Sequence, residues 1–196
     1  MSETVSIKDV AAVRSGYTFR KTTSIPVNGD LLGLQIGDIR HSRVVDPSRL
    51  SAIELPDEGH PPMLERGDVV LAAKGSHNYA AVFHDAHRQV VPSNQFLVLS
   101  VLDTASVSPA FLCWLLNYKG TQQRLARYQA GSRMASINKK AFLDFAIPLP
   151  LPVTQDKILR LNRLGEEERR LTETLMANRE TMLQGMIQQL LDGAVQ

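Results

Sequence analysis

Two segments of the sequence concentrate side chains that can bind phosphates and the edges of bases. The first, residues 74–79, places a lysine, a serine, a histidine, an asparagine and a tyrosine around one glycine. The second, residues 131–140, combines a glycine with serines, an arginine and two lysines, and leads into a predicted helix whose first amides favour a phosphate. Because arginine and lysine suit phosphates or guanine and asparagine suits adenine, both segments are typical of DNA-binding loops.

Two further basic segments, residues 20–23 and 40–43, add positive charge to this set. The alternative interpretation is that all four segments are ordinary solvated loops, since charged residues are mostly exposed in any protein. We interpret them as a DNA-binding surface because together they supply both cations and base-reading groups. The candidate DNA-binding residues are Arg20, Lys21, Arg40, Lys74, Ser76, His77, Asn78, Tyr79, Ser132, Arg133, Ser136, Lys139 and Lys140.

Motifs for catalysis are missing from the sequence. It contains no glycine-rich dinucleotide or phosphate-binding motif and no nucleophile elbow. The segment at residues 60–63 has two adjacent prolines but lacks the flanking residues that an amino-methyltransferase site needs. A nuclease pattern around Asp57 and Lys74 fails because Ala72 stands where an acidic metal ligand is required. We therefore expect no catalytic residue in this chain.

Metal ligands and a reactive thiol are also not predicted. His84 and His87 lie between two β-prone runs without further ligands nearby, which favours an exposed turn over a metal site. Cys113 lies inside the apolar run of residues 111–116, where a thiol is usually a small buried hydrophobe with a raised pKa. The sequence therefore predicts no metal centre.

The composition predicts a folded globular protein. The chain has 196 residues, of which 43% are hydrophobic and 21% are charged, and its single cysteine excludes an intramolecular disulfide framework. The net charge of +2 neither requires nor excludes a polyanionic partner. No apolar segment approaches the roughly 18 residues of a membrane span, and the first residues lack signal-peptide features. We expect a cytoplasmic protein with no membrane partner.

The elements that must position the loops follow from hydrophobic periodicity. Short β-prone runs separated by turn signals occupy residues 31–39, 69–73, 80–83 and 96–101. Helical patterns cover residues 6–13 and 109–128, and a third short helix is predicted to start near Asn138. The sequence therefore predicts an α+β (mixed α/β) globular domain over residues 1–150.

A proline-rich connector at residues 147–152 ends this domain, because three prolines on alternate positions fix an extended backbone. Strong helix formers follow from Thr154 to residue 191 and predict one helix about 55 Å long within residues 151–196. The chain offers no second helix of this length, so the partner helix should come from another copy or another protein. The alternative is that this long helix packs against the globular domain of its own chain. The coiled-coil spacing, interrupted by Glu168 and Asn178, predicts an interface of Leu161, Leu164, Leu171, Leu175, Met182, Met186 and Leu190.

The chain resembles the specificity (S) subunits of type I restriction-modification systems. The resemblance rests on segments in that family's order, at residues 7–11, 15–19, 35–39, 64–71, 93–96, 131–137 and 147–158. The last segment is the most specific, because a Leu-Pro connector that ends in glutamine and enters a long helix joins recognition domain and spacer helix in that family. A full-length member has two of each, so this sequence is similar to a half-length S subunit.

The resemblance implies a non-enzymatic DNA-recognition subunit. One domain would read half of a bipartite site on double-stranded DNA, and two copies would pair their helices antiparallel into a homodimer that reads an inverted repeat. Adenine methylation with S-adenosylmethionine and ATP-driven cleavage would belong to methyltransferase (M) and restriction (R) subunits, to which the chain would dock. The chain itself would bind neither cofactor, and the target adenine would be flipped into the M subunit.

Two other functions stay open at this point. The first is a protein-interaction module whose long helix docks on a partner and whose globular part no longer binds DNA; an acidic surface around the two loops would favour it. The second is an enzyme with an unrecognised site, which binding of S-adenosylmethionine or a metal would indicate.

Overall fold

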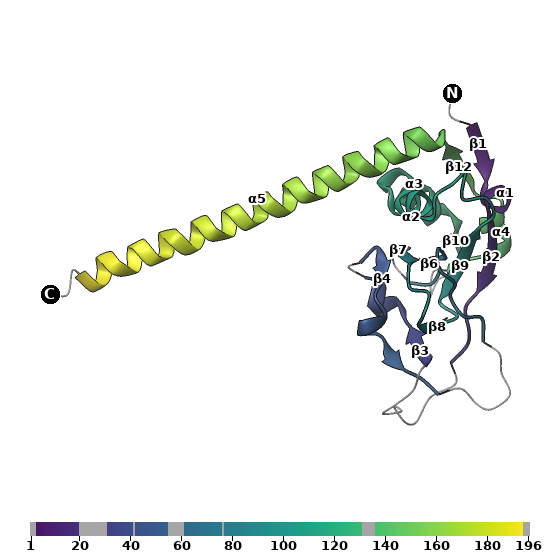
Figure 1. The fold of residues 1–196 in the computed structure, drawn as a ribbon, viewed down its shortest axis with the longest axis horizontal. Coiled ribbons are helices and arrows are strands. Elements are labelled where there is room, and N and C mark those ends of the chain that lie inside the picture. The colour runs from purple at the N-terminus through teal and green to yellow at the C-terminus, as the bar shows by residue number, and fades with distance from the viewer. Residues whose placement is uncertain are drawn as a thin grey trace. The chain divides into compact units, whose positions relative to one another are not determined.

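The computed structural model describes residues 3–19, 31–40, 42–54, 61–75, 77–130 and 136–193 (Figure 1). Contacts divide the chain into two compact units, Met1–Gln155 and Asp156–Gln196. The first unit combines several sheets with short helices, and the second is helical. The predicted α+β fold followed by a long C-terminal helix is therefore confirmed.

A five-stranded sheet forms the centre of the first unit, in the order β2 (Ala11–Ser15), β9 (Phe96–Val101), β6 (Val69–Ala72), β7 (Ala80–Phe83) and β4 (Val44–Val45). Neighbouring strands are antiparallel except for β4, which pairs parallel with β7. Strands β6 and β7 are buried along their whole length, as expected for short apolar runs without polar alternation.

A smaller sheet shares the hydrophobic core of the larger one and has the order β5 (Ser51–Ala52), β3 (Leu31–Leu34) and β8 (Gln89–Pro92). Leu34 and Val90 belong to the same buried cluster as Phe83 and Phe96. The predicted strand over residues 31–39 is too long, because a 3-10 helix, η1 (Ile36–Ile39), follows β3. The backbone N–H of Gln35 donates to the Asp38 carboxylate (2.8 Å) and fixes this turn.

The predicted helix over residues 109–128 is in fact two helices. Helix α2 (Pro109–Asn117) begins at Ser108, whose hydroxyl accepts from the Phe111 N–H (3.1 Å), and packs on β6 and β7. At Tyr118 the backbone is extended (ψ 135°), and α3 (Lys119–Leu125) follows. A 3-10 turn, η3 (Ala126–Tyr128), and β10 (Gln129–Ala130) complete this part of the chain.

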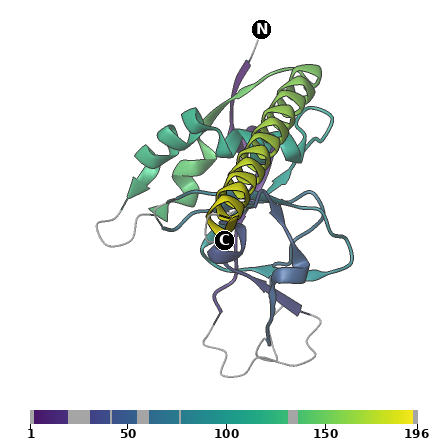
Figure 2. The same cartoon turned by 90° about the vertical axis from the view of Figure 1, so that its left-hand side faces the viewer.

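The predicted helix over residues 6–13 is likewise too long. Only α1 (Ile7–Val10) is helical, and the chain then enters β2, where pairing with β9 determines the conformation. At the other end of the first unit, α4 (Lys139–Leu143) begins after Asn138 as predicted. Strand β1 (Glu3–Ser6) pairs antiparallel with β12 (Ala146–Leu149), so the two ends of this unit lie side by side (Figures 1 and 2).

Helix α5 (Pro152–Gly193) is a single unbroken helix of 42 residues (Figure 2), about 63 Å long at 1.5 Å per residue. It begins two residues before the predicted Thr154, because Pro152 suits the first helical position, where its missing N–H needs no partner. The Gln155 side chain is buried and donates to the carbonyls of Ser106 (2.7 Å) and Pro150 (3.0 Å). No helix in the described part of the chain is both long and apolar enough to cross a membrane.

A buried ion pair joins two strands of the large sheet to the segment before β6. Asp68 is only 2% exposed and accepts from the Arg14 guanidinium (2.5 Å), the Ser100 hydroxyl (2.7 Å) and the Glu65 N–H (2.8 Å). Arg14 also donates to the Met63 carbonyl (2.9 Å). The network therefore satisfies the carboxylate with one cation and two neutral donors.

The Cys113 thiol is buried in α2 and donates to the Ala80 carbonyl (3.5 Å). Burial raises its pKa to about 12, so almost no thiolate exists at pH 8. We expect an aromatic disulfide reagent at pH 8 to leave the folded chain unmodified and to label one thiol per chain in denaturant. The neutral thiol stabilises the fold fully below about pH 9, and this contribution is lost as the pH rises toward 12. Rapid labelling of the folded chain at pH 8 would contradict the burial and the raised pKa of the Cys113 thiol.

Candidate nucleic-acid interface

The structure brings the ends of the two predicted DNA-binding loops together. Lys74, which follows β6, forms an isolated antiparallel bridge with Ser136 in β11 (Ser136–Ile137). The Ile137 N–H donates to the Ala73 carbonyl (2.8 Å), and the Ala73 N–H donates to the Gln95 carbonyl (2.8 Å). Backbone pairing therefore joins residues from three distant parts of the sequence beside the end of β6.

Residues 77–79 place two rings next to each other. His77 is exposed, Tyr79 is half-buried, and their rings are nearly parallel, with an interplanar angle of 4° and centroids 5.4 Å apart. Asn78 between them is only 3% exposed, and its amide donates to the Ala72 carbonyl (2.7 Å). In an extended segment alternate side chains share one face, which explains why the two rings pair while Asn78 is buried.

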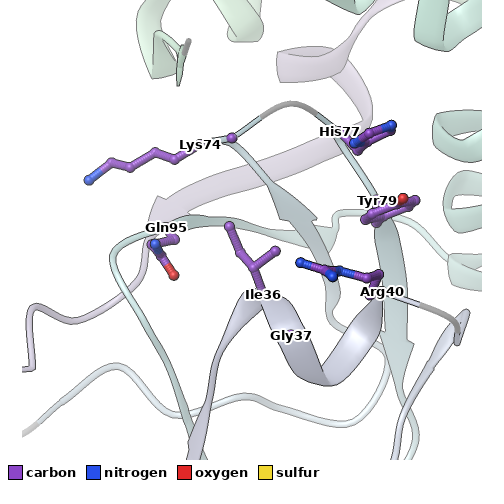
Figure 3. A pocket seen from close by; sticks show the side chains of 8 residues that line it. Ile36, Gly37, Arg40, Lys74, His77, Tyr79 and Gln95 are labelled. Atoms are coloured by element: carbon purple, nitrogen blue, oxygen red, sulfur yellow. The ribbon is translucent and has the colours of Figure 1, made fainter. Parts of the chain in front are cut away.

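Two adjoining hollows in the surface share Arg40, His77 and Tyr79; together we call them the basic groove. The first, about 460 Å³, is also lined by Ile36, Gly37, Lys74, Gly75 and Gln95 (Figure 3). The second, about 530 Å³, is also lined by Ile39, Ser42, Arg43, Asn117, Lys119 and Gln122. Among the described residues that line the basic groove, four are lysine or arginine and none carries a carboxylate. Its chemistry therefore suits a polyanion.

The remaining candidate residues divide into two groups. Lys139 and Lys140 are exposed at the start of α4, where the Asn138 side chain accepts from the Lys140 N–H (2.8 Å). Ser136 is half-buried at the bridge to Lys74. The other five predicted residues lie outside the described residues: Arg20, Lys21, Ser76, Ser132 and Arg133.

Comparison with models of protein families shows the family of this chain. The family model of the type I restriction modification DNA specificity domain matches residues 1–175, which is most of the sequence. The chain belongs to this family. The specificity-subunit resemblance drawn from the sequence is therefore confirmed at the level of the family.

Solved structures of the specificity family have the same fold. The chain is 15% identical to the S subunit from M. genitalium (TM-score 0.58), with 92% of this chain and 43% of that chain covered. A structure described as the basis of complex assembly in a type I R-M system is 20% identical (TM-score 0.68), with 97% of this chain and 45% of that chain covered. The HsdS subunit from Thermoanaerobacter tengcongensis is 18% identical (TM-score 0.63), with 88% of this chain and 39% of that chain covered. The chain thus spans less than half the length of these proteins. No curated protein sequence matches it.

Several residues that line the basic groove in this specificity domain were not among the candidate residues predicted from the sequence. They are Arg43, Gln95, Asn117, Lys119 and Gln122. Arg43 lies in the basic segment at residues 40–43 that was predicted to bind DNA, and Gln95 lies in the segment at residues 93–96 that carries part of the family resemblance. Asn117, Lys119 and Gln122 were hidden inside the predicted continuous helix, and only the break at Tyr118 would have drawn attention to them.

The histidine pair of the specificity domain lies in a turn. The Asp85 carboxylate accepts from the backbone N–H groups of His87 (2.7 Å) and Arg88 (3.0 Å), which lowers its pKa. Among the described residues, no cluster of three or more histidine, cysteine or acidic side chains could hold a metal ion.

Proposed function

We propose that this chain is the DNA-recognition subunit of a type I restriction-modification system and has no catalytic role of its own. The observation that carries the proposal is the basic groove: its described lining has four cations and no carboxylate, and it lies where the two loops meet. Cations on such a surface bind phosphates of either strand and position the domain on the duplex.

Base reading in this proposal falls to the polar side chains between the cations. Gln95 and Lys74 lie on one side of the first hollow, and Arg40, His77 and Tyr79 lie on the other (Figure 3). Glutamine pairs with adenine edges, lysine and arginine pair with guanine edges, and the rings offer apolar contact to thymine methyl groups. The loop residues outside the described part of the chain, Ser76, Ser132 and Arg133, belong to the same proposed surface.

The second part of the proposal is a homodimer formed through α5. The residues of the predicted interface are all exposed in the chain, from Leu161 to Leu190. At 100° per residue, those from Leu161 to Met182 fall within an arc of about 80°, which is the narrow seam that one partner helix covers. An antiparallel pair of identical helices has a two-fold axis, so the two domains would read an inverted repeat.

Methylation and cleavage would then be supplied by other subunits. The M subunits would carry the S-adenosylmethionine chemistry on the flipped adenine, and the R subunit would join through the complex. The proposal therefore expects the isolated chain not to bind S-adenosylmethionine or ATP. Saturable binding of either by calorimetry would favour an enzyme instead.

We expect loss of Arg40 or Lys74 to weaken DNA binding. The full chain is titrated into 40-base-pair duplexes of random sequence at 50 mM salt, where phosphate contacts are strong. Each of Arg40→Ala and Lys74→Ala should raise Kd about tenfold and reduce the slope of log K against log salt by about 1. Arg49→Ala and Lys8→Ala are matched controls, because both cations are exposed and line neither hollow.

Equal Kd values for the groove variants and the controls would contradict the assignment of the groove. If the unchanged chain binds no duplex even at 50 mM salt, the protein-interaction module becomes the better explanation. Where binding is found, selection from the same random pool should enrich a two-part inverted repeat.

A further inference from the structure

The side chain of Gln122 in α3 connects two carbonyl groups from different parts of the specificity domain. Its amide nitrogen donates to the Asn78 carbonyl (2.7 Å) and to the Leu116 carbonyl (2.6 Å). The Leu116 carbonyl lies in the last turn of α2, where helix carbonyls need partners from outside the helix. One side chain thus ties the segment that carries the ring pair to the end of a helix.

Asn117 holds the next part of this segment. Its side-chain oxygen accepts from the Ala80 N–H (3.1 Å), and its side-chain nitrogen donates to the Ala80 carbonyl (2.8 Å). The amide therefore pairs with Ala80 as a neighbouring strand would. Together with the bond from the Asn78 amide to Ala72, three amide side chains fix residues 78–80.

The fixed residues determine where the rings lie. Because Asn78 is held inward, its neighbours His77 and Tyr79 must project to the other face. Both rings line each hollow of the basic groove, so a shift of Asn78 would move them relative to Arg40 and Lys74. Restricting such motion before binding increases affinity, because less conformational entropy is lost in the complex.

We infer that Gln122 is a positioning residue for DNA recognition, which acts by fixing Asn78 and thereby the His77–Tyr79 ring pair. This inference rests on the proposed function. Gln122 adds no charge, so its contribution differs from that of the groove cations in one measurable respect. Its loss should lower affinity without changing the salt dependence, because no phosphate contact is removed.

The test compares Gln122→Met with Gln123→Met in the full chain. Methionine keeps the length of glutamine but has no N–H, and Gln123 is the exposed neighbour on the same helix. With random 40-base-pair duplexes at 50 mM salt, Gln122→Met should raise Kd about three- to tenfold with an unchanged salt slope, and Gln123→Met should leave Kd unchanged. In a chain that also carries His77→Ala and Tyr79→Ala, Gln122→Met should have no further effect on Kd.

Amide hydrogen exchange provides a readout that does not need DNA. The Ala72 N–H donates to the Tyr79 carbonyl (2.8 Å), so its exchange should accelerate in Gln122→Met and not in Gln123→Met. Unchanged exchange, or a loss of affinity that persists in the chain without the two rings, overturns the inference. If the unchanged chain binds no duplex, the proposed function fails and the inference fails with it. If binding is present and Gln122→Met does not alter it, the inference alone fails.

Discussion

A chain with Leu171→Lys and Leu175→Lys is expected to be a monomer of 21.7 kDa at concentrations where the unchanged chain is a dimer of about 43 kDa. Both leucines are exposed in the single chain, by 54% and 69%, and lie on the narrow seam of α5. Pairing two such helices would place four lysines in the apolar interface, and burying unpaired charges costs several kcal/mol. Light scattering at micromolar concentration measures the mass directly.

The matched control is a chain with Ala177→Lys and Thr181→Lys. It adds the same charge at the same spacing of four residues, but on the polar face of the helix, and should remain a dimer. A dimer that survives the leucine substitutions would contradict the proposed seam. An unchanged chain that is already a monomer would mean that α5 pairs with a different protein.

The second large effect is expected at the buried ion pair of the first unit. Replacing Asp68 with alanine should lower the free energy of unfolding by about 3 kcal/mol, because Arg14 loses its counter-charge and Ser100 and Glu65 lose their acceptor. This is the low end of the cost of breaking a buried ion pair, since the Arg14 side chain is 31% exposed. Urea denaturation of the purified chain measures this loss.

Asp144→Ala provides the comparison. Asp144 pairs with Lys8 at 2.7 Å, but both side chains are more than half exposed, so its removal should hardly move the urea midpoint. If the Asp68→Ala and Asp144→Ala variants unfold at the same urea midpoint, the buried network does not stabilise the fold. In a chain with both Arg14→Met and Asp68→Leu, much of the stability should return, because neither charge is left unpaired.

Sequence patterns predicted those elements whose conformation is determined by neighbouring residues in the sequence. The runs at residues 80–83 and 96–101 are strands with the predicted bounds, because each is a short and largely apolar run that contains valine and phenylalanine. Residues 11–13 suit a helix as well as a strand, and pairing with β9 decided between the two. Asn117 and Gly120, two residue types that favour turns, flank the break at Tyr118, but the apolar spacing on both sides of it predicted a continuous helix.

The candidate site was predictable in its residue types and not in its arrangement. The bridge between Lys74 and Ser136 joins positions far apart in the sequence, and periodicity contains no information about such a pairing. Asn78 has the side chain of an adenine reader, yet the structure buries its amide against Ala72. No sequence pattern pointed to Gln122 or Asn117, because their side chains bind backbone groups of Asn78 and Ala80 that only the folded chain brings near them.

The attachment of residues 78–80 also bears on how such a protein can acquire a new target. Gln122 binds the carbonyl of Asn78, and Asn117 binds the N–H and carbonyl of Ala80, so both side chains contact backbone atoms that every amino acid except proline provides. Side chains at positions 77 and 79 can therefore be exchanged while the scaffold keeps its hold on the main chain. Change of specificity and retention of the fold therefore depend on alternating positions within the four residues 77–80.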